Sequence, residues 1–253
     1  MPDKRKHRGP HPDDRTLFTP DQWARLRGAV RDYSTLLTWG YAPAGALKLV
    51  GDHFRLVRRQ RLAVMRAACG EPQRQGRQAR RIEPRELAGR EVVIDGYNLL
   101  ITVEAHLAGG VVLRARDGCL RDLAGMHGSY RRVEETAPAL RRIGEVLVDL
   151  RPASVHWLLD RPVSNSGRLK GIIEALAAEH GWPWRVALSE CTDHDLAICE
   201  GPIVTSDSAV LDRCGPWCNL AACIVERCPR SEPIIDLSDE ATATPAVRPD
   251  TAS

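Results

Sequence analysis

Apolar residues in the first third of the chain recur every three or four positions, which is the spacing of one face of a helix. This pattern predicts two helices, over 19–40 and 42–68. The first begins with a capping box, because Thr19 accepts hydrogen bonds from the backbone that follows and Gln22 lies three residues later. The two helices are expected to form a small α-helical unit.

After residue 90, short runs of Val, Ile and Leu alternate with longer stretches of helical spacing. Such an alternation predicts a parallel β-sheet covered by helices. We expect strands at 92–95, 155–160, 186–189, 203–207 and 222–226. We expect helices at 138–150, 167–180, 194–199 and 208–213, with one more inside a long insertion at 109–135. The fold class is therefore α/β, a parallel-sheet domain preceded by a small α-helical domain.

The same patterns divide the chain into domains and connecting segments. The first residues are polar and rich in proline, and the stretch after the helices is rich in Arg and Gln without apolar periodicity. The expected parts are a flexible arm at 1–18, a basic α-helical domain at 19–70, a linker at 71–90, an α/β domain at 91–237 and a disordered tail at 238–253.

The net charge of +3 conceals two halves of opposite sign. Residues 1–90 carry 20 Lys and Arg against 9 Asp and Glu, a net charge of +11, and residues 91–253 carry the remaining 16 and 24, a net charge of −8. A basic unit suits a polyanion, so nucleic acid is the expected partner. The expected contacts are Arg55, Arg58, Arg59 and Arg61. A solvated basic surface, or pairing with the acidic half, explains the same charges.

The composition excludes several classes of protein. An apolar share of 43% and a charged share of 27% are ordinary for a globular chain. No stretch reaches the roughly 20 apolar residues that span a bilayer, and the first residues lack a secretory signal, so a cytoplasmic protein without a membrane partner is expected. The chain also lacks the glycine motifs of dinucleotide folds and P-loops, and the G-x-S-x-G elbow of esterases.

The eight cysteines are expected to be reduced thiols, since a chain of 253 residues builds its own core without disulfides. The last four are separated by three, four and four residues, a spacing that loosely meets the ligand rule for structural zinc. A place in the core as small apolar residues is the alternative. Both interpretations are open for Cys214, Cys218, Cys223 and Cys228.

The strongest chemical signal is an aspartate at the end of three expected strands, at Asp95, Asp160 and Asp207. The carboxyl ends of parallel strands meet in one crevice, where carboxylates repel one another unless a cation lies between them. Asp193 and Asp195 begin the helix before the last of these strands, and either can supply a fourth acid. Oxygen ligands suit Mg²⁺ or Mn²⁺, so these aspartates are the expected metal-binding and catalytic residues. The competing interpretation is that each aspartate only caps the helix that follows it.

Polar residues near these strand ends are candidate substrate contacts. Short polar side chains after the middle aspartate lead into a helix N-terminus, which favours an anion. Charged residues within 114–122, with His127 and the segment 130–132 (YRR), are candidates for a clamp on the substrate backbone, and an exposed salt-bridged helix fits them equally well. The candidate contacts are Asn98, Asp117, Arg121, Arg161, Ser164, Asn165, Ser166, Ser206 and Ser208. Ordinary turns and caps account for most of these residue types as well.

Three segments that contain these aspartates resemble the PIN-like and NYN nucleases. The segments are 93–100 (VIDGYNLL), 157–160 (WLLD) and 203–208 (IVTSDS), and Asp195 resembles the helix-borne acid of these enzymes. The resemblance implies a PIN-like fold of the NYN and FLAP type that binds a metal ion through these acids. PIN nucleases carry a further acid after the first strand, for which the candidates are Glu104, Asp117, Asp122, Glu134 and Glu135.

Over residues 10–230 the chain resembles a prokaryotic family that joins an N-terminal helical domain of unknown function, number 434 in its series, to a PIN-like C-terminal domain. The motifs that carry this resemblance include 58–61 (RRQR), 95–98 (DGYN), 160–167 (DRPVSNSG) and 205–208 (TSDS). The resemblance implies a metal-dependent domain similar to a ribonuclease.

These features together predict a nuclease that depends on Mg²⁺ or Mn²⁺, with RNA as the expected substrate. Water activated by the metal ion would attack phosphorus in line, and the basic helices would recruit the strand. Two other functions are open: a non-catalytic nucleic-acid-binding module on the same scaffold, and a phosphatase for small phosphoesters. The pattern carries no indication of an oligomeric state.

Overall fold

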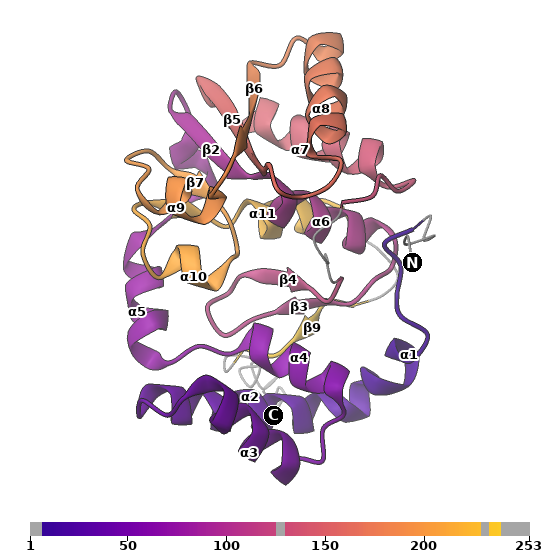
Figure 1. Ribbon diagram of the computed structural model, residues 1–253, viewed down its shortest axis with the longest axis vertical. Coiled ribbons are helices and arrows are strands. Elements are labelled where there is room, and N and C mark those ends of the chain that lie inside the picture. Colours follow the sequence, from indigo (N-terminus) through magenta and orange to yellow (C-terminus); the bar gives the residue numbers. More distant parts are fainter. Residues whose placement is uncertain (1–6, 125–129, 229–232, 239–253) are drawn as a thin grey trace, which may run out of the picture.

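A computed structural model describes residues 7–124, 130–228 and 233–238 of the chain. Its centre is a six-stranded sheet in which every neighbouring pair of strands is parallel, as the sequence predicted (Figure 1). In spatial order the strands are β1 (Arg81–Ile82), β8 (Trp217–Cys218), β7 (Ile203–Val204), β2 (Glu91–Asp95), β5 (Ser154–Asp160) and β6 (Trp184–Ser189).

Helices cover both faces of this sheet, because side chains on a strand alternate between its two faces. Val92 and Ile94 belong to the larger core, which also takes the apolar sides of α6, α7, α8 and α11, whereas Val93 packs against a smaller cluster under α9 and α10. The helices are α6 (Gly96–Leu107), α7 (Thr136–Leu150), α8 (Ser166–His180), α9 (Thr192–Ala197), α10 (Ser208–Leu211) and α11 (Leu220–Glu226). In the described ranges, no helix has the length and apolar character to cross a membrane.

A second, three-stranded sheet joins the two halves of the chain. Its strands are β4 (Leu120–Asp122), β3 (Val112–Arg114) and β9 (Ile235–Asp236), in that spatial order. The N-terminal helices pack beneath it, as Figure 1 shows, and Val30 and Val64 share a core with Leu113 and Ile235. These helices are α1 (Asp14–Leu17), α2 (Pro20–Thr38), α3 (Pro43–His53) and α4 (Arg58–Ala67).

The helix predicted at 42–68 is wrong as a single element, because it is divided into α3 and α4. Arg55 adopts a left-handed backbone with φ of 50°, and Leu56 N donates to Gly51 O at 2.8 Å, which closes α3. Leu56 is buried, so the turn itself contributes to the core. The apolar stripe continues through this turn in the sequence and therefore concealed it.

The linker predicted at 71–90 and the flexible arm predicted at 1–18 both contain regular structure. The former holds α5 (Glu71–Arg80), β1 and the 3₁₀ helix η1 (Pro84–Leu87). The described part of the latter holds α1, and Arg59 of α4 pairs with the buried carboxylate of Asp14. Isolated apolar residues such as Phe18 and Leu87, together with charge pairs, hold these segments, so hydrophobic periodicity did not reveal them.

Three smaller expectations are also corrected. The apolar run at 222–226 is part of α11 and not a strand, since a short apolar run does not distinguish the two states. The strand expected at 203–207 is β7, which ends at Val204. The described residues of the insertion at 109–135 form β3 and β4 and no helix; 125–129 lie outside the description. Of the tail expected at 238–253, only Ser238 is described, and it is buried.

Candidate functional site

The six-stranded sheet changes its direction of winding between β2 and β7. The chain proceeds from β2 to β5 and β6 on one side and then returns to β7 and β8 on the other. In open parallel sheets, ligands bind at the carboxyl ends of the strands where the winding reverses. Asp95, the last residue of β2, and Asp207, which follows β7, both lie at this point.

Asp95 lies at the bottom of this crevice and is held from both sides. Its side chain is buried, Asn98 N donates to one carboxylate oxygen at 3.3 Å, and Thr205 Oγ1 donates to the other at 2.8 Å. The glycine at position 96 permits this arrangement, because a Cβ there would lie 2.8 Å from Leu158 O. Asp95 is thus also the N-cap of α6, as the competing interpretation expected.

Three further carboxylates act on this buried one or on each other, and with it they form what we call the acidic cluster: Asp95, Asp160, Asp193 and Asp207. Burial, together with the negative charges of Asp207 and Asp160, raises the pKa of Asp95 to about 7. Burial and the same two charges raise the pKa of Asp193. As the side chains stand, no three His, Cys, Asp or Glu residues in the described part of the chain are arranged to hold a metal ion.

The helix-borne acid of the cluster is Asp193, whereas the sequence favoured Asp195. Both lie on α9 and both are exposed. Asp195 accepts a hydrogen bond from Ser189 Oγ at 2.6 Å, which holds its carboxylate at the end of β6. We place Asp193 in the acidic cluster because the charges of Asp207 and Asp160 act on it.

A buried hydroxyl without a partner lies beside the cluster. Tyr97, in the first turn of α6, is 3% exposed, and in the described structure its Oη makes no hydrogen bond. Burial and the charge of Asp160 raise its pKa to about 12. A buried donor without an acceptor costs free energy, so such a group is a signal of a site that is completed by a ligand.

Several predicted substrate contacts instead fasten the walls of the crevice. Asn98 Oδ1 accepts from both the backbone N and the Oγ of Ser206, each at 2.8 Å, and so ties α6 to the end of β7. Ser208 begins α10, which Asp207 caps through Ala209 N at 2.8 Å. These contacts set the distance between the two strand ends that carry the acids.

Asp117 and Arg121 are not at the surface, as a clamp on substrate requires, but are buried in an ion-pair network. Arg77 Nη1 donates to Asp117 Oδ2 at 2.5 Å and Arg121 Nη2 donates to the same oxygen at 2.7 Å. Arg77 also pairs with Asp212 at 2.7 Å. We call these four residues, Arg77, Asp117, Arg121 and Asp212, the paired-charge cluster. Sequence reasoning missed Arg77 because it placed this residue in a linker.

The loop after Asp160 has both exposed and buried members. Ser164 and Arg161 are exposed, and Arg161 pairs with Glu190 at 2.9 Å. Ser166 Oγ donates to Arg161 O at 3.3 Å, and Asn165 Nδ2 donates to Tyr130 O at 3.0 Å. A local turn interaction therefore occupies Ser166 and a contact with the segment before α7 occupies Asn165, while Ser164 is open to solvent.

The basic helices divide the predicted nucleic-acid contacts into two pairs. Arg59 binds Asp14, and Arg61 binds Asp52 at 2.7 Å and Leu56 O at 2.9 Å, so both stabilise the helical unit. Arg55 and Arg58 are exposed, and among the described residues neither has an ion-pair partner. Of the four arginines predicted to contact nucleic acid, only Arg55 and Arg58 are therefore available to bind a polyanion.

The other candidates for a further acid lie away from the acidic cluster. Glu104 is buried in a network with Arg8 Nε at 2.8 Å, Tyr130 Oη at 2.5 Å and Thr136 Oγ1 at 2.6 Å. Asp122 accepts from Thr102 Oγ1 at 2.9 Å. Glu134 and Glu135 lie beside His7. Asp117, in the paired-charge cluster, is already neutralised.

The cysteines show no zinc cluster within the described residues. All eight are free thiols. Cys214 lies in the small core under α9 and α10, and Cys218 lies in the large core, where burial raises the pKa of its thiol to about 12. A place in the core accounts for both.

The fold and the crevice together define an α/β protein with a doubly wound parallel sheet and a helical unit packed on a second sheet. Residues 84–223, more than half of the chain, match the family described as Domain of unknown function (DUF5616), and the protein belongs to this family. Residues 25–80 match Protein of unknown function (DUF434), which confirms that part of the resemblance.

One relative extends over most of both chains. Uncharacterized protein MJ0935 of Methanocaldococcus jannaschii is 27% identical over 186 residues, which cover 74% of this chain and 88% of that protein. No solved structure matches.

Proposed function

We propose that this protein is a metal-dependent nuclease that hydrolyses phosphodiester bonds, with RNA as its substrate, on a PIN-like domain of the NYN type. The observation that carries the proposal is the position of Asp95, a buried carboxyl at the winding reversal of the sheet whose strongest charged neighbours, Asp207 and Asp160, are also acids, and the raised pKa of Asp95 agrees with it. A helix cap needs no second and third carboxylate nearby. A cation-binding site does.

A divalent cation such as Mg²⁺ or Mn²⁺ fits the donor set of the acidic cluster. All four donors are carboxylates, the ligand type that these hard ions prefer. Asp95 is held by two hydrogen bonds, whereas the described structure gives the Asp160 carboxylate no hydrogen-bond partner and leaves Asp193 exposed. Asp160 and Asp193 therefore change rotamer at little cost to complete the ligand set around Asp95.

The chemistry divides between the ion and the residues of the crevice. A bound divalent cation supplies positive charge at the scissile phosphate and stabilises the charge that develops as the bond breaks. Asp95, whose pKa burial and the charges of Asp207 and Asp160 raise to about 7 without a cation, would hold the ion as the ionised carboxylate, a form that a bound cation favours. Asn98 and Thr205 hold the two strand ends at a fixed separation while substrate binds.

The charge of the N-terminal half supports a polymeric substrate over a small phosphoester. The net charge of residues 1–90 is +11, and the exposed Arg55 and Arg58 remain available on the helical unit. Such a surface gains affinity from many phosphates at once, which a small phosphoester does not provide.

Turnover of labelled RNA by the purified full chain tests the proposal. We expect cleavage with Mn²⁺ or Mg²⁺, none with EDTA, and a loss of at least 100-fold in the Asp95→Asn variant at unchanged circular dichroism. Asp193→Asn should reduce cleavage strongly, and Asp195→Asn, a change on the same helix, should reduce it little. Cleavage by Asp95→Asn at the native rate would contradict the proposal. Matched DNA and a chromogenic phosphoester separate RNase, DNase and phosphatase activity.

A non-catalytic nucleic-acid-binding module is the second candidate. It is favoured by the caps that Asp95 and Asp207 form and by the absence of a preformed metal cluster in the described residues. Binding of RNA without turnover in Mg²⁺ and in Mn²⁺, and with equal affinity in Asp95→Asn, would establish this function instead.

A further inference from the structure

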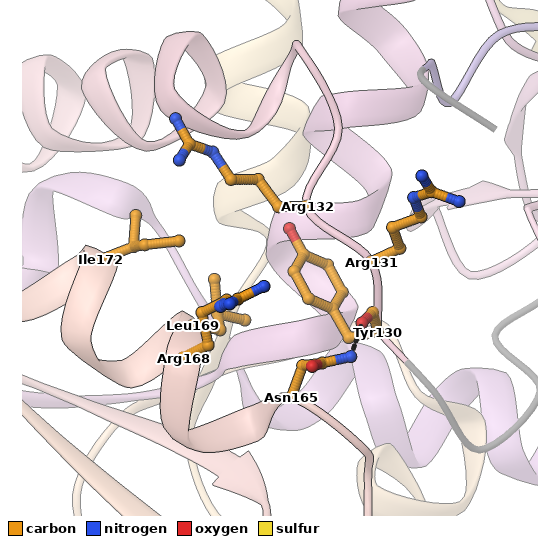
Figure 2. A pocket seen from close by; sticks show the side chains of 7 residues that line it. All are labelled: Tyr130, Arg131, Arg132, Asn165, Arg168, Leu169 and Ile172. Atoms are coloured by element: carbon orange, nitrogen blue, oxygen red, sulfur yellow. Dashed lines mark hydrogen bonds between the residues drawn. The ribbon is translucent and has the colours of Figure 1, made fainter. Parts of the chain in front are cut away.

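A small pocket with three arginines lies outside the acidic cluster. It has a volume of about 150 Å³ and is lined by what we call the arginine pocket residues: Tyr130, Arg131, Arg132, Asn165, Arg168, Leu169 and Ile172. Figure 2 shows Arg132 and Arg168 on one side of the Tyr130 ring and Arg131 on the other. The three guanidinium groups come from two segments that are far apart in the sequence, the approach to α7 and the first turn of α8.

None of these three guanidinium groups has an ion-pair partner among the described residues. The carboxylates nearest in sequence are engaged elsewhere, because Glu134 and Glu135 both lie beside His7. The lack of an ion-pair partner distinguishes the three pocket arginines from Arg77 and Arg121, whose charges are neutralised by Asp117 inside the fold. Arg132 and Arg168 lie on the same side of Tyr130 and Arg131 lies on the other side, and no carboxylate of the described residues pairs with any of them, which favours an external anion.

The pocket is built on a rigid base. Tyr130 is buried, its Oη donates to Glu104 at 2.5 Å, and its backbone carbonyl accepts from Asn165 Nδ2 at 3.0 Å. Arg8 lies over its ring at 5.2 Å and donates to Arg131 O at 3.2 Å. These contacts hold the two segments that carry the arginines next to each other.

The pocket also adjoins the acidic cluster. The rings of Tyr130 and Tyr97 lie 5.3 Å apart, and Tyr97 in turn experiences the charge of Asp160. Asn165 belongs to the loop that directly follows Asp160. A chain of two aromatic rings and one short loop therefore joins a negative crevice to a positive pocket.

We propose that the arginine pocket binds a phosphate group of the nucleic-acid strand whose cleavage is assigned to the acidic cluster. Guanidinium groups match phosphate oxygens in a forked geometry, and the N-terminus of α8 adds to the positive potential. Pockets that enclose whole small ligands have volumes of about 300 to 1,000 Å³. This pocket is smaller, so it can enclose a phosphate with part of its sugar but not a complete nucleotide. The choice of nucleic acid as the carrier rests on the proposed function.

Binding of three fluorescent single-stranded RNAs of one sequence, with a 5′-phosphate, a 3′-phosphate or hydroxyls at both ends, tests this proposal. Anisotropy is measured with the full chain in EDTA, so that no cleavage is needed for the readout. The variant is Arg132→Gln with Arg168→Gln, and the matched control is Arg141→Gln with Arg185→Gln. All four arginines are exposed, and the described structure gives none of them an ion-pair partner. Both doubles therefore remove two charges without disturbing the core.

We expect the pocket variant to lose at least tenfold in affinity and the control to lose less than threefold. Loss confined to one phosphorylated RNA identifies a terminal phosphate, and equal loss for all three identifies an internal one; either supports the proposal. Unchanged affinity in the pocket variant, or an equal loss in the control, overturns it. Tight, pocket-dependent binding by a protein that shows no turnover with Mg²⁺ or Mn²⁺ would reject the nuclease and retain the phosphate pocket.

Discussion

The acidic cluster and the paired-charge cluster lie on two sides of the same short segment, 205–212, and they treat buried charge in opposite ways. In the paired-charge cluster, Arg121 Nε donates to Ser206 O at 2.8 Å and Arg77 pairs with Asp212, so this segment is fixed from one side. On the other side, Thr205 Oγ1 donates to Asp95, whose nearest charges are also negative.

The difference shows in the pKa of the two buried aspartates. Burial disfavours ionisation of both, but the guanidinium groups of Arg121 and Arg77 outweigh it at Asp117 and hold its pKa well below its usual range. No cation is among the groups that act most strongly on the pKa of Asp95, so burial and the charges of Asp207 and Asp160 raise it. A neutralised carboxylate such as Asp117 serves the fold. Burial and like charges both disfavour the ionised form of Asp95, although it caps α6, and such a perturbed group is a candidate for a functional site.

Loss of Asp117 should produce the largest effect on stability. Asp117→Ala leaves two buried guanidinium groups without their shared partner, so we expect the free energy of unfolding to fall by about 3 to 5 kcal/mol. Urea denaturation measures this change, with the exposed Asp195→Ala as the control. A loss below about 1 kcal/mol would show that the paired-charge cluster is not needed for the fold.

Asp95→Asn should increase the free energy of unfolding near and above neutral pH, whereas Asp117→Ala decreases it. The folded pKa of about 7 exceeds the ordinary value of 3.8, so the folded state retains a proton that the unfolded state releases, and stability falls as the pH rises from about 4 to 7. The neutral amide removes this loss, and we expect a gain of about 1 to 3 kcal/mol at pH 8 and little change at pH 4. Thermal unfolding across this pH range measures it. A variant that is less stable than the wild type at pH 8 would mean that Asp95 serves the fold.

Addition of Mn²⁺ should stabilise the wild type by a smaller amount. A ligand at ten times its dissociation constant contributes about 1.4 kcal/mol, which raises the unfolding temperature by a few degrees. Asp193→Asn should reduce this shift and Asp195→Asn should leave it intact, because only Asp193 experiences the charges of Asp160 and Asp207. Equal shifts in both variants would remove Asp193 from the acidic cluster.

The smallest effect is expected at the edge of the paired-charge cluster. The side chain of Asp212 is 35% exposed, and Arg77 retains Asp117 as a partner when Asp212 is replaced. We expect Asp212→Asn to cost about 1 kcal/mol or less in the free energy of unfolding. A loss comparable to that of Asp117→Ala would mean that the four charges act as one unit, which a double-mutant cycle would quantify.

The sequence predicted the strands and their terminal acids because both are local features. Runs of Val, Ile and Leu mark β2 and β5 directly, and an aspartate at a strand end is visible wherever the strand is. Parallel pairing then places such ends at one edge of the sheet, so the proximity of Asp95 and Asp207 followed from the fold class. The fold class does not decide between Asp193 and Asp195 as the helix-borne acid, because this choice depends on how α9 is rotated about its axis.

The charges of the helical unit and of the insertion were the least predictable. Arg55 and Asp117 look alike in sequence, as polar residues among other charged ones, yet the first is exposed and the second is buried. A charged side chain is buried only where it forms an ion pair or hydrogen bonds, and hydrophobic periodicity does not reveal which distant residue is the partner. For the same reason α5, which carries Arg77 in place of an apolar stripe, was expected as a linker.

What the amino-acid sequence alone determined was the α/β class, most of the strands and helices of the main sheet, and the strand-end positions of Asp95 and Asp160, whereas Asp207 follows the end of β7 by three residues. These follow from spacing between near neighbours, which any stretch of chain displays by itself. Only the tertiary structure decided which charges are neutralised and which are not. Asp117 meets Arg77 across 40 positions and Asp212 meets it across 135, and such pairs form only when folding brings distant segments together and excludes the water that would otherwise solvate them.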